Sequence, residues 1–229
     1  MRDISEAFAF PFKDADWPMK FLIGAVFTFL SVFLIGVPVL YGYYIELVQR
    51  VRRGESYPLP EWKDVGVKFI VGFKYFIATL IYSLPILIIV IPLVVTTILT
   101  AVTFGDPDIT GVFTGGMWFI AAILVILPYS LFIALMLPVI TIRFAERERI
   151  IDAIDIGSVL RLFGKYWQDS IIAALLAFVV SLFSWIGIIA LIVGILFTLF
   201  YGSLVRFHLY GQIAQTIESA TPPPIQQPL

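Results

Sequence analysis

Residues 170–205 read "SIIAALLAFVVSLFSWIGIIALIVGILFTLFYGSLV", and this apolar run decides the fold. As one helix, at about 1.5 Å per residue, it would be roughly 54 Å long. A bilayer core of about 30 Å needs only about 20 helical residues. The run therefore fits two short helices that turn near Trp185-Ile186-Gly187. We predict a helical hairpin, with helices over about 170–186 and 188–215.

The composition places the whole chain in the membrane class. The chain is 60% hydrophobic and 14% charged, with a mean hydropathy of +1.00, whereas a soluble domain is about 45–50% apolar and about 25% charged. A net charge of −1 gives no general basic surface for nucleic acid. The sequence has no cysteine, which excludes disulfides, iron–sulfur clusters and thiolate zinc sites.

Three further long apolar runs lie upstream, at residues 21–48, 69–102 and 117–142. The second and third are each long enough for one membrane crossing. The first is too long for one upright helix and too short for two full spans, and Gly36 and Pro38 interrupt it. It fits either one kinked helix or a shallow hairpin of two helices. The helices expected from these runs cover about 19–35, 37–53, 66–102 and 116–145.

The distribution of Lys and Arg predicts which loops are cytoplasmic. Both residues are frequent in segments 49–74 and 143–169 and absent from 103–116, so the first two are cytoplasmic and the third is external. Arg2 and Lys13 favour a cytoplasmic N-terminus, which requires the first run to cross twice or to dip and return. We expect an all-α, polytopic membrane helix bundle of six transmembrane or part-spanning helices, multi-pass in the cell membrane, with both termini cytoplasmic.

The predicted helices form one domain. Residues 1–18 are expected to be a cytoplasmic interfacial segment, because they are acidic and no small-residue cleavage site follows the first apolar run. Residues 19–217 are expected to form a single transmembrane helical domain. Residues 218–229 are proline-rich and have little to bury, so they are predicted to be a disordered tail.

Residues 150–167, "IIDAIDIGSVLRLFGKYW", alternate polar and apolar side chains with helical spacing. The pattern predicts an amphipathic connector helix along the cytoplasmic membrane surface, which Gly157 and Gly164 weaken and are expected to break. We interpret it first as a connector. It is also a candidate surface for a protein partner or for anionic lipid, together with the basic end of helix 37–53. The candidate contact residues are Arg50, Arg52, Arg53, Asp152, Asp155, Arg161 and Lys165.

Two segments share a Tyr-Gly start, "YGYYIELV" at 41–48 and "YGSLVRFH" at 201–208. If they reflect two related helices, Glu46 and Arg206 lie at equivalent points and form a candidate intramembrane ion pair. The alternative is that the match arises by chance, and that both side chains extend to the cytoplasmic headgroups.

Small residues recur four positions apart in the final apolar run. Such stripes let helix backbones approach closely in lipid. We expect them to pack the final hairpin together, and a homodimer interface is the alternative. The two stripes are Ala173, Ala177 and Ser181, and Ala190, Gly194, Thr198 and Gly202.

No motif points to catalysis, a cofactor or a metal, so we do not expect an enzyme. The spans 86–102, 119–141 and 171–205 carry no ionisable side chain except tyrosine, which disfavours an ion-coupled transporter. The leading hypothesis is a non-enzymatic scaffold or accessory subunit of a membrane complex. The alternative is a transporter or channel for a lipid, an amphiphile or a small uncharged solute. The expected partners are membrane lipids, a protein on the cytoplasmic face or a second copy, and not nucleic acid.

The order of landmarks resembles a known family. The landmarks are "AFPFKDADWPMKFLIG", "GYYIELVQRVRRGESYPLPEWKD", a proline-containing helix pair, "RFAERERIIDAIDIGSVLRLFGKYWQD" and "YGSLVRFHLYGQ". Over residues 7–215 they resemble the archaeal and bacterial integral membrane proteins called domain of unknown function 4013. The resemblance implies a helical membrane architecture. It implies no activity, because none is established for the family.

Overall fold

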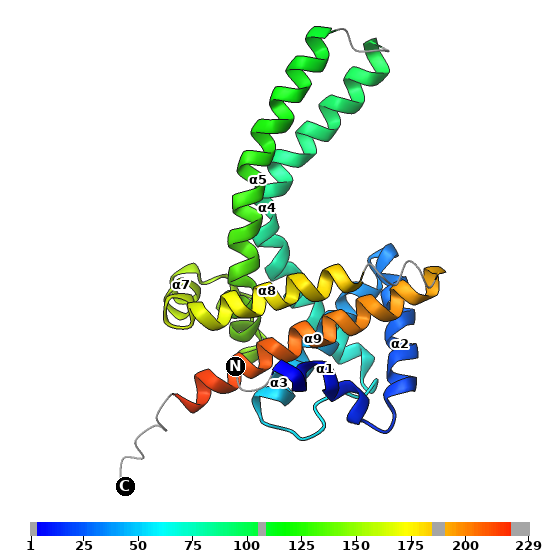
Figure 1. Cartoon of the computed structure of the whole chain (residues 1–229), viewed down its shortest axis with the longest axis vertical. Coiled ribbons are helices and arrows are strands. Elements are labelled where there is room, and N and C mark those ends of the chain that lie inside the picture. Colours follow the sequence, from blue (N-terminus) through cyan, green and yellow to red (C-terminus); the bar gives the residue numbers. More distant parts are fainter. Residues whose placement is uncertain (1–3, 105–108, 185–190, 221–229) are drawn as a thin grey trace. The chain divides into compact units, whose positions relative to one another are not determined.

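The computed structural model describes residues 4–104, 109–184 and 191–220, and its regular elements in these ranges are all helices (Figure 1). The prediction of an all-α fold is confirmed. The single domain expected over 19–217 divides into two compact units, Met1–Ala78 with Met136–Leu229, and Thr79–Leu135. In chain order the elements are α1 (Ile4–Ala9), η1 (Phe10–Lys13), α2 (Trp17–Leu30), η2 (Ser31–Phe33), α3 (Gly36–Arg52), α4 (Val65–Phe104), α5 (Ile109–Arg147), α6 (Ile150–Ile154), α7 (Ile156–Lys165), α8 (Trp167–Ser184) and α9 (Leu191–Ser219).

The first apolar run is a hairpin and not one kinked helix. α2 and α3 pack against each other, and the chain turns between them at Leu34, whose φ of 63° is left-handed. The turn is tight, because a Cβ added at Gly36 would lie 2.0 Å from the carbonyl oxygen of Phe27. Glycine is therefore required at this position, and it allows α3 to start against the end of α2.

The core of the first unit lies where α3 packs against α9. α3 contributes fully buried side chains, among them Tyr43 and Leu47. Tyr44 stacks on Phe207 of α9, with the ring centroids 4.8 Å apart. In a membrane such contacts stabilise the helix pair mainly through close packing of the rings, at about 0.5–1.5 kcal/mol for an aromatic pair.

The final hairpin forms as predicted, with α8 packed against α9. Thr198 Oγ1 donates to the carbonyl oxygen of Ser184 at 2.8 Å, and Ser184 Oγ donates to that of Thr198 at 3.2 Å. A Cβ at Gly202 would lie 2.5 Å from Ser184 Oγ, so the small residue permits this approach. Ala173 and Ala177 are buried on the same face of α8, but Ser184 takes the place expected for Ser181. The predicted turn at 185–187 and Ala190 lie outside the described residues.

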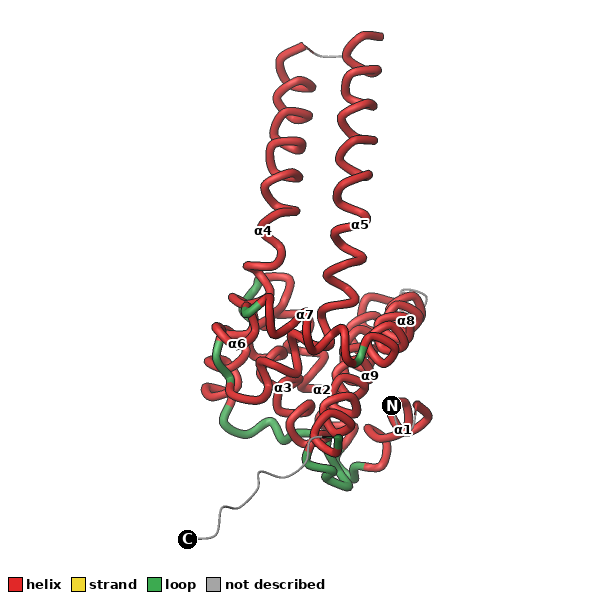
Figure 2. Tube along the Cα trace, turned by 90° about the vertical axis from the view of Figure 1, so that its left-hand side faces the viewer, coloured by secondary structure: helices red, strands yellow, loops and turns green. Residues whose placement is uncertain are grey.

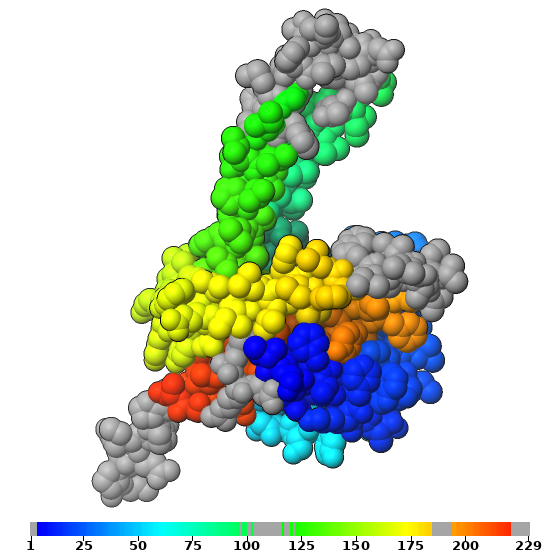
Figure 3. All heavy atoms as spheres, in the orientation of Figure 1, coloured from blue at the N-terminus to red at the C-terminus, as the bar shows by residue number. Residues whose placement is uncertain are grey.

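The N-terminal segment is packed into the first unit. Ala7 of α1 is fully buried against Val205 and Leu209 of α9. Phe10 stacks on His208, with the ring centroids 4.2 Å apart. Figure 3 shows the atoms of α1, in dark blue, lying against α8 and α9. Of the segment 1–18, expected to be interfacial, at least Ala7 and Phe10 thus contribute to the packing of the helices.

Three helix boundaries differ from the prediction. α5 begins at Ile109 and not near 116, so the glycines between 111 and 116 are helical and do not form a loop. The amphipathic connector breaks at Asp155, between α6 and α7, and not at a glycine. α9 continues to Ser219, and the rest of the predicted tail, from residue 221 on, lies outside the described residues.

Within the described residues, three helices are long and apolar enough to cross a membrane, at Val65–Thr96, Ala122–Arg147 and Trp167–Ser184. A fourth span results if Ile4–Lys13 and Trp17–Phe33, which meet at 101°, form one broken crossing. The chain is therefore a multi-pass membrane protein. α3 has 17 residues, short of the about 20 that a crossing needs, so the six crossings stay a prediction.

The second unit, Thr79–Leu135, contains the C-terminal part of α4 and the N-terminal part of α5, and the two helices run side by side in Figure 2. The hydroxyl of Tyr129 on α5 donates to the carbonyl oxygen of Tyr82 on α4 at 2.8 Å. α4 passes through Pro85 and Pro92 without interruption. Thr96 Oγ1 donates to the carbonyl oxygen of Pro92 at 2.8 Å, the usual bond of a threonine hydroxyl to the carbonyl four residues earlier in a helix.

Candidate functional site

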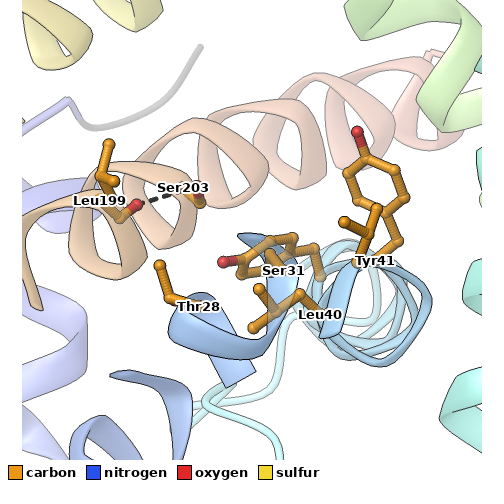
Figure 4. Close-up of a pocket in the computed structure, with 8 residues that line it drawn as sticks. Thr28, Ser31, Leu40, Tyr41, Leu199 and Ser203 are labelled. Carbon is orange, nitrogen blue, oxygen red and sulfur yellow. Dashed lines mark hydrogen bonds between the residues drawn. The ribbon is translucent and has the colours of Figure 1, made fainter. Parts of the chain in front are cut away.

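A groove of about 170 Å³ lies between α2, η2, α3 and α9 in the first unit (Figure 4). Figure 4 shows that the wall from α9 faces the side chains from α2 and η2 across the space, with α3 beside them. Eight residues line it: Thr28, Ser31, Val37, Leu40, Tyr41, Tyr44, Leu199 and Ser203.

Most hydroxyl groups in the groove already donate to the protein. Thr28 Oγ1 and Ser31 Oγ each donate to a backbone carbonyl four residues earlier, at 2.8 Å. Ser203 Oγ donates to the carbonyl oxygen of Leu199 at 2.9 Å. The hydroxyl of Tyr41 makes no hydrogen bond within the described part of the chain, so it can donate to a ligand.

Arg206 extends the α9 wall of the groove. It lies three residues after Ser203 and seven after Leu199, which places all three on one face of the helix. Its Nε is buried without a hydrogen-bond partner, and no carboxylate among the described residues pairs with it.

The predicted ion pair between Glu46 and Arg206 is wrong. Glu46 binds Lys68 of α4 through Oε2, and its Oε1 accepts from Arg50 NH2 at 2.7 Å. Lys68 is only 6% exposed and needs this counter-charge. Both carboxylate oxygens are therefore occupied without Arg206.

The basic end of α3 is paired with acidic residues of the same unit. Arg50 lies 3.6 Å from Glu55, Arg53 lies 2.7 Å from Glu55, and Arg52 lies 2.9 Å from Glu218 of α9. Exposed pairs of this kind contribute little to stability, about 0–1 kcal/mol each. They do neutralise the three arginines that were candidate contacts for lipid or for a partner.

The four candidate residues on the connector serve different local roles. Asp155 Oδ1 accepts from the backbone N–H of Ser158 at 3.2 Å and starts α7. The hydrogen bonds from Ser158 hold the pKa of Asp155 below its usual range. Arg161 NH2 donates to Ser158 Oγ at 3.1 Å, and Lys165 lies over the ring of Tyr166. Asp152 has a buried Oδ2 without a hydrogen-bond partner in the described residues.

The connector also exposes large apolar side chains. Ile151, Ile156 and Leu160 are exposed, and Trp167 follows them at the start of α8. Exposed isoleucine and tryptophan beside charged residues are typical of a helix at a membrane surface. This pattern supports the predicted interfacial position of the connector.

The loop after α3 is anchored against α2 by a buried lysine. Lys20 Nζ lies 2.8 Å from Asp14 and 2.7 Å from Glu61. Trp62 Nε1 donates to the carbonyl oxygen of Lys20 at 2.9 Å. The hydrogen bond from Lys20 holds the pKa of the Glu61 carboxyl below its usual range. This cluster was not predicted from the sequence.

Tyr43→Phe is expected to loosen this loop. The Tyr43 hydroxyl donates to the carbonyl oxygen of Pro60 at 2.9 Å, and the side chain is fully buried. Losing the bond leaves a carbonyl unpaired and costs about 1 kcal/mol. Trypsin cleavage after Arg53 should become faster. Tyr57→Phe, in the same loop at an exposed residue, should leave the rate unchanged; equal rates for wild type and Tyr43→Phe would contradict the assignment.

Within the described residues, no group of three or more histidine or acidic side chains could hold a metal ion. The groove itself was missed by sequence reasoning, although two of the helices that line it, α3 and α9, each contain one of the Tyr-Gly segments. Segments 41–48 and 201–208 pack together in the structure as parts of α3 and α9. The match thus identified two helices that pack together, but it paired Glu46 with Arg206 incorrectly.

Comparison with known proteins gives one match. The family model described as "Protein of unknown function (DUF4013)" matches residues 25–198, which contain α3, α4, α5, α8 and the groove residues of α2. Neither the curated proteins nor the solved structures give a match. Because the family model covers most of the chain, the chain belongs to the DUF4013 family of proteins of unknown function.

Proposed function

We propose that this protein is a non-enzymatic accessory or scaffold subunit of a membrane complex, and that its partner packs against the α4–α5 helix pair. The proposal rests on the length of this pair. Residues 75–104 of α4 and 109–142 of α5 contain no acidic or basic side chain. At about 1.5 Å per residue these stretches are roughly 45 Å and 51 Å long.

Lipid alone does not cover so long an apolar helix pair. The hydrocarbon core is about 30 Å thick, so hiding these stretches by tilting would need an angle of roughly 50°, beyond the usual range of about 0–40°. Of the most apolar 18-residue stretch within Val65–Thr96, only 6% is buried against other parts of the chain. A partner helix would cover the part that neither the chain nor the bilayer covers.

Photo-crosslinking in intact membranes tests this proposal. A photoreactive phenylalanine analogue would replace Ile91 or Ile98, which are more than half exposed and lie seven residues apart on one face of α4. We expect both positions to yield one discrete adduct with another protein. Leu22 on α2, which is equally exposed, provides the matched control and should yield lipid adducts. Lipid adducts alone at Ile91 and Ile98 would contradict the proposal.

A second candidate function, movement of a lipid or amphiphile across the membrane, is favoured by the groove between α2, α3 and α9. The groove is lined by apolar side chains and hydroxyls, which suits an amphiphile. Flux of a fluorescent phospholipid in reconstituted liposomes tests it, and an unchanged flux in Arg206→Gln would count against it.

A further inference from the structure

We propose that the groove and Arg206 form a binding site for an anionic membrane lipid, with the headgroup phosphate at Arg206 and part of one acyl chain in the groove. This inference is independent of the accessory-subunit function. It would hold whether or not a partner protein covers α4 and α5.

The charge of Arg206 supports an anion site. Two cations are buried among the described residues of the first unit, and each has a carboxylate: Lys20 lies beside Asp14 and Glu61, and Lys68 binds Glu46. Arg206, on the same helical core, has no carboxylate partner among the described residues. Because a partly buried charge without a counter-charge is costly, a bound anion at Arg206 would stabilise the folded protein.

The second argument is the arrangement of donors. The buried Nε of Arg206 has no acceptor, and the hydroxyl of Tyr41 has no partner within the described residues. Tyr41 and Ser203 line the same groove, and Arg206 follows Ser203 by three residues on the same face of α9. A guanidinium and a phenol hydroxyl together suit phosphate oxygens, which accept several charge-assisted hydrogen bonds.

The third argument is the size and rim of the groove. Its volume of about 170 Å³ is smaller than the about 300–1,000 Å³ of a pocket that encloses a drug-sized ligand. A ligand would therefore enter only in part and extend outward. Next to the groove, the four consecutive residues Val32 to Ile35 are 62–73% exposed and all apolar. An acyl chain that leaves the groove would continue along them, which a free phosphate ion could not use.

Lipid titration of the full chain in detergent, followed by native mass spectrometry, tests the site. We expect dioleoyl phosphatidylglycerol to bind the wild type about tenfold more tightly than dioleoyl phosphatidylcholine, because the choline cation of phosphatidylcholine cancels the headgroup charge and is repelled by Arg206. Arg206→Gln should abolish this preference. Arg206→Lys should retain part of it. Arg161→Gln, which removes an exposed arginine of α7 away from the groove, should have no effect.

Two further measurements distinguish a bound lipid from a free phosphate ion. Ser203→Leu fills the groove and should weaken binding of both lipids, because it removes the space for the acyl chain. Inorganic phosphate at millimolar concentration should not compete; if it displaces phosphatidylglycerol fully, the site takes a free anion and the proposal is wrong. Equal binding of both lipids to the wild type, or an unchanged preference in a folded Arg206→Gln variant, would also overturn it. The melting temperature of each variant verifies folding.

Discussion

Gly72→Ala is expected to lower the free energy of unfolding by about 3 kcal/mol, because α3 and α4 touch backbone to backbone at this position. A Cβ added at Gly72 would lie 1.7 Å from the carbonyl oxygen of Pro38 and 2.4 Å from the backbone nitrogen of Gly42. Gly42 is equally constrained, since its Cβ would lie 1.9 Å from the carbonyl oxygen of Lys68. Neither neighbour is a side chain that can rotate away, so the helices would have to separate.

Gly66→Ala provides the matched control on the same helix. Nothing lies within 4 Å of a Cβ at Gly66, and alanine is favoured over glycine in a helix by up to about 1 kcal/mol. Thermal unfolding of the detergent-solubilised variants should therefore show a lower melting temperature for Gly72→Ala and an equal or higher one for Gly66→Ala. Similar melting temperatures for the two variants would mean that the α3–α4 contact is placed incorrectly.

Glu46→Gln is expected to destabilise the protein by about 2–3 kcal/mol. This is at or below the low end of the effect of breaking a buried ion pair, about 3–5 kcal/mol, because the Glu46 side chain is 26% exposed. The substitution leaves Lys68, which is 6% exposed, without its carboxylate. Lys68→Met should cost less, because Glu46 keeps Arg50 at 2.7 Å. The double variant Glu46→Gln/Lys68→Met should then be more stable than Glu46→Gln alone.

A double-mutant cycle from thermal unfolding measures this coupling. Arg52→Gln serves as the comparison, since its pair with Glu218 joins two exposed or part-exposed side chains and should contribute about 0–1 kcal/mol. If the effects of Glu46→Gln and Lys68→Met simply add, the two side chains do not interact as the structure shows.

The long helices were predictable because the lengths of the apolar runs, and the charged residues between them, are enough to locate them. The helix expected over 37–53 is found at Gly36–Arg52, and that expected over 66–102 is found at Val65–Phe104. α5 began earlier than expected because glycine was taken as a loop signal, whereas a glycine within a long apolar helix costs only about 1 kcal/mol.

The interactions at the site were not predictable, because they join elements distant in the sequence. Glu46 was matched to Arg206 by a repeat of two letters, but its partner Lys68 is brought close only by the α3–α4 contact at Gly42 and Gly72. The connector breaks at Asp155 because the Asp155 side chain accepts a hydrogen bond from the backbone N–H of Ser158 and so starts α7. This local hydrogen bond sets the position of the break, whereas the prediction used only the low helix propensity of glycine. The groove forms only where three helices pack together. The spacing of residues along one helix does not predict which other helices pack against it.

Native mass spectrometry of the gently extracted protein tests the central claim, that this chain is an accessory subunit, most directly. The account predicts a complex whose mass exceeds that of the chain by the mass of at least one different membrane protein. A mass equal to the chain alone, or to a whole multiple of it, would contradict the account.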